Sequence, residues 1–360
     1  MGISCSTGAL STASQFIPGI GVFMKAFVTG STGLLGSNLT HLLLNQGFEV
    51  IALTRELTKA SKILGEHPSL KVVQGDLQEV NGFAQHLKGC DVLFHTASYF
   101  RESFDYGDHW KQLKTINVDA TIHLLEAAEK AGVSKVVYVS SACGCVGIIR
   151  GGAPSNESTP FQEFNHKNPY FKSKLMAEEA ISNFLKSHSL PVVLILPAGM
   201  MGPNDAAPTE LGRFILNFLK GKAPLVPSGG FPIVDARDVA MSMLSAVYSG
   251  QPNERYLVTG GYYSVDEIMR NLSEASGQPV PNKKLPRFAV RLWAMIQNII
   301  GRIKGQKPFL PGDMVRVMLS RQWFDASKAA QGLKTSYRPL KDTIKDTVQW
   351  YEKNGYVRDA

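Results

Sequence analysis

From residue 24 onward, short apolar runs alternate with longer segments that have helical periodicity. The apolar runs are nearly continuous in Val, Ile and Leu, which is typical of parallel strands buried on both faces. Residues 34–46 and 118–131 show the helical pattern, and Gly132 follows the second segment where a helix C-terminus favours glycine. The six predicted strands are Lys25–Thr29, Glu49–Leu53, Lys71–Gln74, Asp91–His95, Lys135–Ser140 and Val192–Leu196.

This alternation predicts an α/β fold of the Rossmann type, with a doubly wound parallel sheet covered by helices on both faces. After about Pro197 the rhythm breaks and Pro and Gly become frequent, which indicates a smaller, irregular α/β substrate-binding lid in the C-terminal half. The predicted sheet domain is 24–196, with 230–262 returning to it, and the predicted lid is 197–229 and 263–360.

The first 23 residues do not fit either domain. They are small and polar, without the charged and apolar regions of a secretory signal. Because Met24 directly precedes the first strand, we expect 1–23 to be a disordered or misassigned extension. The alternative is an acylated terminus, since Met1 to Ser6 fit the myristoylation pattern and Cys5 offers a second acylation position.

Composition narrows the class of protein. With 44% hydrophobic and 19% charged residues, the chain is globular, not disordered, collagenous or coiled-coil. Its 38 basic and 30 acidic residues give a net charge of +8, which favours an anionic partner. The four cysteines, Cys5, Cys90, Cys143 and Cys145, form neither a disulfide framework nor a cluster with metal-ligand spacing. We predict no metal site and a reducing, cytoplasmic location.

The first strand leads into a glycine-rich turn and then a helix. Glycines there allow close approach of the backbone to a pyrophosphate, and the helix N-terminus supplies N–H groups for the anion. The spacing is G-x-x-G-x-x-G, which departs from the usual G-x-G-x-x-G fingerprint. The predicted dinucleotide contacts in this loop are Thr29, Gly30, Thr32, Gly33, Leu34, Leu35 and Gly36.

The second strand is followed by Arg55, where a site selective for NAD would place an acidic residue for the ribose 2′-hydroxyl. A guanidinium suits a 2′-phosphate, so we predict NADP in preference to NAD, with the adjacent Glu56 leaving NAD open. Asp76, next to Leu77 after the third strand, either reaches the adenine amino group or caps a helix.

The fifth strand ends at Ser140 and Ser141, at the sheet edge where open α/β folds bind ligands. Tyr170 and Lys174 lie four residues apart and therefore share one face of the next long helix. A lysine ammonium beside the phenol, together with a cationic nicotinamide, would lower the pKa of Tyr170. A second Y-x-x-x-K, at Tyr337, contains a proline and follows no strand that ends in serine.

As a set, these motifs resemble the extended short-chain dehydrogenase/reductase family, also called the NAD-dependent epimerase/dehydratase family, over about residues 24–357. The resemblance implies Ser141, Tyr170 and Lys174 as catalytic residues, with Ser140 the alternative to Ser141. It also implies cofactor contacts at Thr96, Ala97, Asn117, Tyr170, Lys174 and Pro197. The supporting segments are 29–36, 94–97, 117–121, 139–142, 170–174, 235–240 and 323–329.

The resemblance implies an NADP-dependent oxidoreductase that reduces a carbonyl, or oxidises a secondary alcohol, of a hydrophobic small molecule. Relatives acting on nucleotide sugars often carry an Asn where this chain has Gly199, which favours the dihydroflavonol reductase and 3β-hydroxysteroid dehydrogenase branch. Tyr99, in an aromatic loop after the fourth strand, is a further candidate substrate contact. The alternatives are a nucleotide-sugar epimerase or dehydratase with tightly bound NAD, and a non-catalytic NADP-sensing regulator or scaffold.

Residues 275–312 contain seven Lys or Arg and no acidic residue, around a broad apolar helical face. The favoured interpretation is a lid helix that packs this face on the core, and the alternative is peripheral contact with an anionic membrane. No nucleic-acid-binding motif is present, and a homodimer is expected only from the family resemblance. The apolar positions are Phe288, Leu292, Trp293, Met295, Ile296, Ile299, Ile300 and Ile303.

Overall fold

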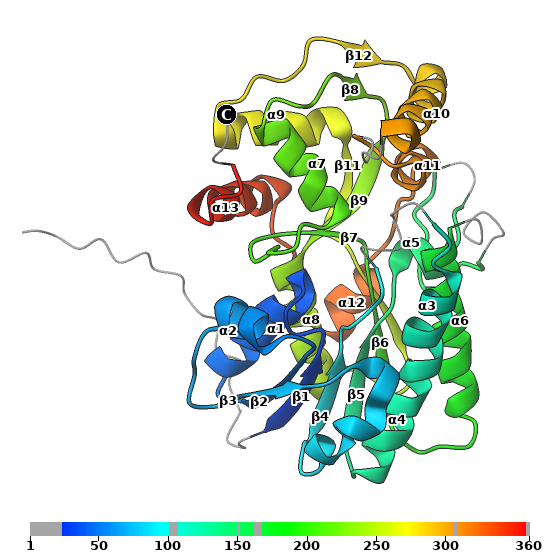
Figure 1. Ribbon diagram of the computed structural model, residues 1–360. Helices are drawn as coiled ribbons and strands as arrows, with labels where there is room; N and C mark the ends of the chain where they lie inside the picture. The colour runs from blue at the N-terminus through cyan, green and yellow to red at the C-terminus, as the bar shows by residue number, and fades with distance from the viewer. Residues whose placement is uncertain (1–23, 101–106, 150–151, 162–167, 305–308, 358–360) are drawn as a thin grey trace, which may run out of the picture.

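The computed structural model describes residues 24–357 apart from 101–106, 150–151, 162–167 and 305–308. The predicted N-terminal extension, including Cys5, lies outside this range. A large parallel sheet with helices on both faces carries a smaller body of helices and short strands beyond one edge (Figure 1). The predicted Rossmann-type fold with an irregular C-terminal lid is therefore confirmed.

The large sheet has the strand order β10-β6-β5-β4-β1-β2-β3, and every neighbouring pair is parallel. From β1 the sheet grows in one direction through β2 and β3, and in the opposite direction through β4, β5, β6 and β10. Such a switch point between β1 and β4 opens a crevice at the carboxyl ends of the strands. The six predicted strands are confirmed to within one residue at each end. The strands are β1 (Lys25–Thr29), β2 (Glu49–Thr54), β3 (Leu70–Gln74), β4 (Val92–His95), β5 (Lys135–Val139), β6 (Val192–Pro197) and β10 (Arg255–Val258).

Both faces of this sheet are covered. Helices α1 (Leu34–Asn45) and α8 (Ala236–Ser249) share a core cluster with Val28, and α4 (Ala120–Lys130) and α6 (Pro169–Phe184) share another with Phe27. Since successive side chains of a strand point to opposite faces, burial on both faces requires continuous apolar runs. The pattern seen in the sequence follows directly from this layering.

Further helices and strands complete the large domain and the lid. Around the large sheet lie α2 (Leu57–Leu64), η1 (Leu77–Gly82), η2 (Ala84–Leu87), α3 (Trp110–Lys114), η4 (Thr115–Asp119), α5 (Ala142–Cys145) and α12 (Ser327–Gly332). The lid contains α7 (Glu210–Leu219), α9 (Val265–Ser276), α10 (Arg287–Lys304), α11 (Gly312–Ser320), α13 (Leu340–Lys353), and the strands β7 (Gly199–Met201), β8 (Val226–Pro227), β9 (Gly230–Asp235), β11 (Gly261–Ser264) and β12 (Lys284–Leu285). None of the helices in the described ranges is long and apolar enough to cross a bilayer.

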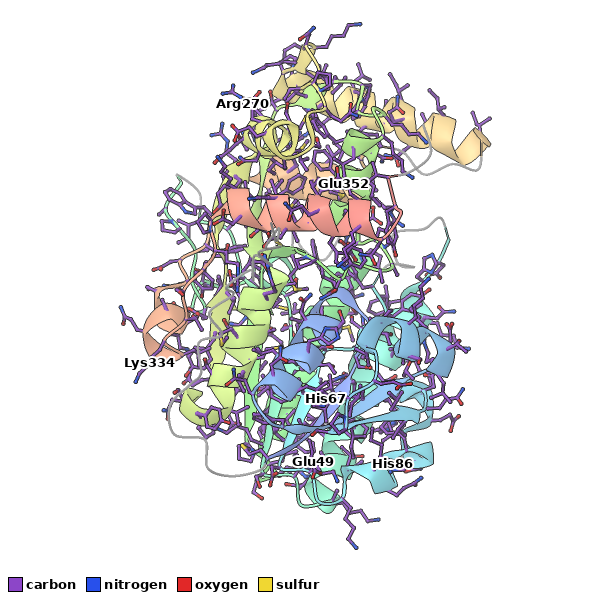
Figure 2. All side chains as sticks on the ribbon, turned by 90° about the vertical axis from the view of Figure 1, so that its left-hand side faces the viewer. Glu49, His67, His86, Arg270, Lys334 and Glu352 are labelled. Carbon is purple, nitrogen blue, oxygen red and sulfur yellow. The ribbon has the colours of Figure 1, made fainter. Side chains whose placement is uncertain are left out.

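The chain passes between the two domains several times. Within 230–262, α8 and β10 join the large sheet, whereas β9 pairs with β7 and β11 in the lid. Helix α12, inside the range predicted for the lid, contacts β10 instead. Figure 2 accordingly shows Lys334 beside the large domain, while Arg270 and Glu352 lie on the lid. The domain boundaries drawn from the sequence remain a prediction.

Candidate active site

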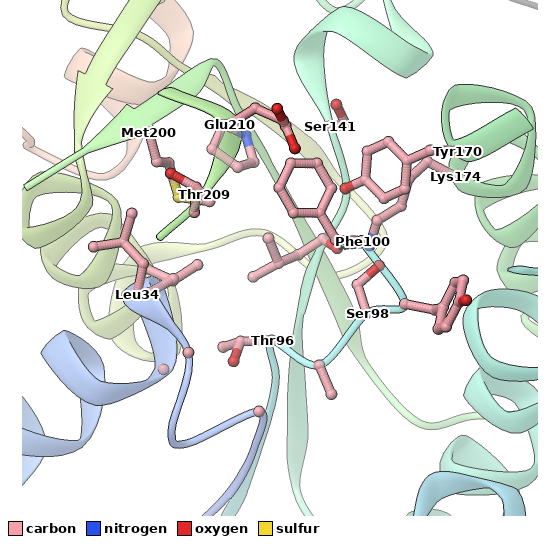
Figure 3. A pocket seen from close by; sticks show the side chains of 18 of the residues that line it. Leu34, Thr96, Ser98, Phe100, Ser141, Tyr170, Lys174, Met200, Thr209 and Glu210 are labelled. Atoms are coloured by element: carbon pink, nitrogen blue, oxygen red, sulfur yellow. Dashed lines mark hydrogen bonds between the residues drawn. The ribbon is translucent and has the colours of Figure 1, made fainter. Parts of the chain in front are cut away.

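A cavity of about 520 Å³ lies where the carboxyl ends of the large sheet's strands meet the lid (Figure 3). Its walls include the glycine-rich turn, the ends of β2, β5 and β6, and parts of α6, α7 and α11. The cavity therefore occupies the crevice that the switch point between β1 and β4 opens. It brings together residues that are far apart in the sequence.

The glycine-rich turn fits the diphosphate of a dinucleotide. Gly30 has a φ of +68°, and a Cβ placed on it would lie 2.7 Å from Ala97 N. A Cβ on Gly36 would lie 2.1 Å from Gly30 O, so neither position admits a side chain. The N-cap of α1 is Gly33, which has no side chain to accept hydrogen bonds from the first N–H groups of the helix. The first turn of α1 also carries no acidic residue. The N-terminus of α1 is thus available to an anion at the cavity wall.

Two cations that follow β2 also line the cavity. Arg55 follows β2, and Lys59 lies in the first turn of α2. Lys59 was not predicted, although its position four residues after Arg55 at the start of a helix is a signal that could have found it. Glu56 also lines the cavity. Asp76 lines it while its Oδ1 accepts a 2.9 Å hydrogen bond from Gln78 N, so this carboxylate caps η1.

Helix α6 places Tyr170 and Lys174 on the cavity wall. The helix begins at Pro169, because Asn168 caps it by accepting a 3.0 Å hydrogen bond from Phe171 N. Tyr170 thus lies in the first turn and Lys174 one turn later on the same face. Figure 3 shows both side chains beside Ser141 at the edge of the cavity.

Burial decides the protonation of this pair. It raises the pKa of Tyr170 above the ordinary phenol value, and a hydrogen bond with Ser98 opposes this in part. The lowering by Lys174 together with a cationic nicotinamide stays a prediction; here Lys174 Nζ donates a 2.8 Å hydrogen bond to Val139 O. Burial also lowers the pKa of Lys174 to about 8. At neutral pH the phenol is therefore protonated, which is the form that can donate a proton.

The structure distinguishes the two serines after β5, although both line the cavity. The Ser140 hydroxyl donates to Glu178 and lies 3.3 Å from Cys145 Sγ, so it belongs to a buried polar network. Ser141 caps the short helix α5 without a side-chain hydrogen bond to that helix. Of the two serines, Ser140 is therefore held in the buried network, whereas Ser141 lies on the cavity wall at the start of α5.

Two of the predicted cofactor contacts lie behind the cavity wall. Thr29 Oγ1 lies 2.7 Å from His95 Nδ1, and its side chain is fully buried. Asn117 accepts a 2.7 Å hydrogen bond from Tyr99 N and donates a 2.9 Å bond to Ser173 Oγ. Neither is among the residues that line the cavity. Asn117 instead connects the Tyr99 loop to α6, next to Lys174.

The predicted substrate contacts lie in the half of the cavity under the lid. Tyr99 lines the wall, but its hydroxyl lies 2.8 Å from His109 Nδ1. Gly199 also lines it, and a Cβ there would lie 2.9 Å from Leu211 Cδ1 and 3.0 Å from Pro232 O. A side chain at this position would therefore require Leu211 or the Pro232 backbone to shift.

Several residues of this half were not predicted as site residues. The Phe100 ring contacts Tyr170 edge-on at 4.8 Å between centroids, and its place in the aromatic loop was the available signal. Glu210 and Asp313 bring two carboxylates from α7 and α11, and each pairs with a basic residue on its own helix. The unpredicted apolar residues of the wall include Phe100, Phe171, Met200, Leu211, Phe231, Pro232, Met314 and Val317.

Comparison with known proteins assigns the family. The model of the NAD dependent epimerase/dehydratase family matches residues 26–259. The chain belongs to this family. Within it the chain is of the extended short-chain dehydrogenase/reductase type, and it is an NAD(P)-dependent enzyme. The predicted Thr96, Ala97 and Pro197 line the cavity of this family member, as do Leu34, Leu35 and Leu77.

Three relatives show how far the similarity extends. A "Putative dihydroflavonol 4-reductase" of Synechocystis sp. is 32% identical over 92% of this chain and 96% of its own. "Sterol demethylase protein B" of Methylococcus capsulatus is 31% identical over 93% of this chain and 100% of its own. The crystal structure of gox2253 superimposes with a TM-score of 0.77 at 28% identity, covering 92% of this chain and 98% of that one. The similarity thus includes the lid as well as the sheet.

Proposed function

We propose that this family member is an NADP-dependent reductase of a carbonyl group in a hydrophobic small molecule, or, in reverse, a dehydrogenase that oxidises the secondary alcohol with NADP+. The observation that carries the proposal is the single cavity shared by the glycine-rich turn, Ser141, Tyr170, Lys174 and an apolar lid wall. The nicotinamide supplies a hydride equivalent to the carbonyl carbon when bound. The protein's own residues must then handle the charge that develops on oxygen.

The proposed chemistry at the oxygen needs one proton and one hydrogen bond. As the new C–H bond forms, the carbonyl π electrons move to the oxygen, which takes the Tyr170 proton. The Ser141 hydroxyl donates a hydrogen bond to the same oxygen and stabilises its negative charge. Lys174, next to Tyr170 on α6, would hold the nicotinamide ribose and stabilise the tyrosinate that remains.

The substrate half of the cavity supports a hydrophobic compound over a nucleotide sugar. Its lining is largely apolar, and cavities of this kind bind ligands mainly by burial of apolar surface. Gly199 offers no side chain where nucleotide-sugar enzymes often carry an Asn, and a Cβ there would be crowded by Leu211 and Pro232 O. Two of the relatives are named for a dihydroflavonol and a sterol, and both names fit a hydrophobic substrate.

The experiment is a substrate panel with the purified full-length chain, NADPH or NADH, and detection of the product by mass spectrometry. The proposal expects an alcohol product from at least one bulky aromatic or alicyclic ketone. Turnover of nucleotide sugars alone, with NAD retained by the protein, would replace it with the epimerase hypothesis. Tight NADP binding without any turnover would identify a sensor or scaffold.

The preference for NADP is tested at Arg55. Because a charge-assisted hydrogen bond to phosphate contributes about 1.5–3 kcal/mol, Arg55→Asp is expected to weaken NADP binding roughly 10- to 100-fold and to leave NAD binding nearly unchanged. Dissociation constants from fluorescence titration measure both. Lys62→Asp is the matched control, because Lys62 is an exposed cation of α2 that does not line the cavity. Equal losses for NADP and NAD would contradict the predicted role of Arg55.

A further inference from the structure

The outer helix of the lid, α10, exposes an unusual amount of apolar surface. Seven of the eleven large apolar side chains that are exposed within the described ranges belong to it. Phe288 is 84% exposed and Ile303 is 81% exposed, near the two ends of the helix. Extended exposed apolar patches on soluble proteins commonly mark binding surfaces. The seven are Phe288, Leu292, Met295, Ile296, Ile299, Ile300 and Ile303.

The helix packs on the lid with its opposite side. Val290 is fully buried, Ala294 is nearly so, and Arg287 donates a hydrogen bond to Leu319 O. At 100° per residue, the seven exposed side chains project within an arc of about 140°, and Val290 and Ala294 project away from it. The expectation that the apolar face packs on the core is therefore wrong. A narrow side attaches α10 through Val290 and Ala294, with the partly buried Trp293 beside them, and the broad apolar side of the helix faces outward.

Charge indicates what covers this face. The helix has four basic residues and no acidic one, and the whole segment 275–312 has seven basic residues and no acidic one. Arg291, within the helix, is exposed and neighbours the apolar arc. A second copy of this helix would bring like charges together, which opposes pairing. An apolar face flanked by cations matches instead a helix lying at an anionic bilayer surface.

We propose that α10 binds this protein to the surface of an anionic lipid bilayer, with its exposed apolar side chains among the acyl chains and Arg291 at the headgroups. Because α10 packs on α11, and Asp313, Met314 and Val317 of α11 line the cavity, docking brings the lid wall of the cavity close to the membrane. If the proposed reductase function holds, an apolar substrate dissolved in the bilayer is then close to its site. The docking itself does not depend on the reaction.

The test is co-sedimentation of the full-length chain with vesicles of phosphatidylcholine, with and without phosphatidylglycerol. We expect binding to the anionic vesicles that weakens as salt rises. Leu292→Ser and Arg291→Glu should each weaken this binding roughly tenfold or more, through lost apolar burial and lost charge attraction respectively. The matched controls are Leu57→Ser, at another exposed leucine, on α2, and Lys130→Glu, at an exposed cation on α4, and both should bind like the wild type.

Other outcomes would overturn the proposal, whether or not the protein turns over a carbonyl compound. Failure of the wild type to sediment, or equal sedimentation of the α10 variants and the wild type, rules out this helix as a membrane surface. A lipid-free dimer that Leu292→Ser dissociates, measured by light scattering, would show that a second copy covers the face. Loss of binding only when residues 2–23 are deleted would place the anchor in that segment. Circular dichroism confirms that each variant is folded.

Discussion

Replacement of Tyr170 by phenylalanine is expected to lower kcat for carbonyl reduction about a thousandfold and to leave the dissociation constant for NADP within about threefold. The phenol donates the proton that the developing alkoxide needs, and phenylalanine keeps the ring that packs against Phe100. Because burial raises the pKa of this phenol, the wild-type group is protonated and ready to donate across the neutral range. Steady-state rates and fluorescence titration of the cofactor measure the two quantities separately.

Tyr138 provides the matched control. Its ring lies 5.1 Å from Lys174 Nζ, and its buried hydroxyl has no hydrogen-bond partner within the described residues. Tyr138→Phe therefore removes a second buried phenol beside the same lysine, without removing a proton donor from the cavity wall. It should retain nearly full turnover. A Tyr170→Phe enzyme that keeps more than about a tenth of wild-type kcat would contradict the assignment of Tyr170 as the proton donor.

The sheet could be predicted because each of its signals is local. Continuous apolar runs identify buried strands, and Gly30, Gly33 and Gly36 identify the turn that follows the first of them. Tyr170 and Lys174 could be paired because helix geometry fixes their relation over a single turn. The seventh strand, β10, was missed as a strand because its four residues resemble any short apolar segment. Only its pairing with β6 reveals its place.

The lid residues of the site could not be predicted, because their position depends on packing between distant segments. Glu210 and Asp313 reach the cavity from α7 and α11, and no local pattern indicates which lid carboxylates face inward. The orientation of helix α10 could not be predicted from the sequence either. Periodicity predicts that the helix has an apolar face, but it cannot tell whether that face is directed toward the core or toward the outside. For α10 the favoured interpretation was wrong for that reason.

The buried polar network around Ser140 is expected to contribute strongly to the stability of the fold. Glu178, one turn after Lys174 on α6, accepts a hydrogen bond from Ser140 and forms a 2.9 Å ion pair with Arg255 Nε. Arg255, on β10, also donates to Glu157 O at 2.7 Å and to Cys145 O at 2.9 Å. The network therefore ties the seventh strand to α6 and to the segment that follows β5.

Glu178→Ala is expected to lower the free energy of unfolding by about 3 kcal/mol, because it leaves the Ser140 hydroxyl without its hydrogen-bond acceptor and the Arg255 guanidinium without the carboxyl group that it pairs with. This loss is at the low end of the range for removing one partner of a buried ion pair, because the Arg255 side chain is 29% exposed and water can solvate part of it. The measurement is urea unfolding followed by circular dichroism. Glu179→Ala, at the exposed neighbouring position of the same helix, should change stability by less than about 0.5 kcal/mol.

The pH dependence of the stability loss in Glu178→Ala shows whether the charge of Glu178 stabilises the fold. Burial raises the pKa of Glu178 above the ordinary value, and Arg255 opposes this shift. A carboxyl whose folded pKa is raised makes the fold less stable as pH rises from the ordinary value through the folded one. Glu178→Ala lacks this pH dependence. The difference in the free energy of unfolding between wild type and variant should therefore be largest in acid, below the ordinary pKa of a glutamate, and smaller at neutral pH. If the difference instead grew as pH rose toward neutral, attraction between the ionised Glu178 and Arg255 would outweigh the cost of burying the carboxylate.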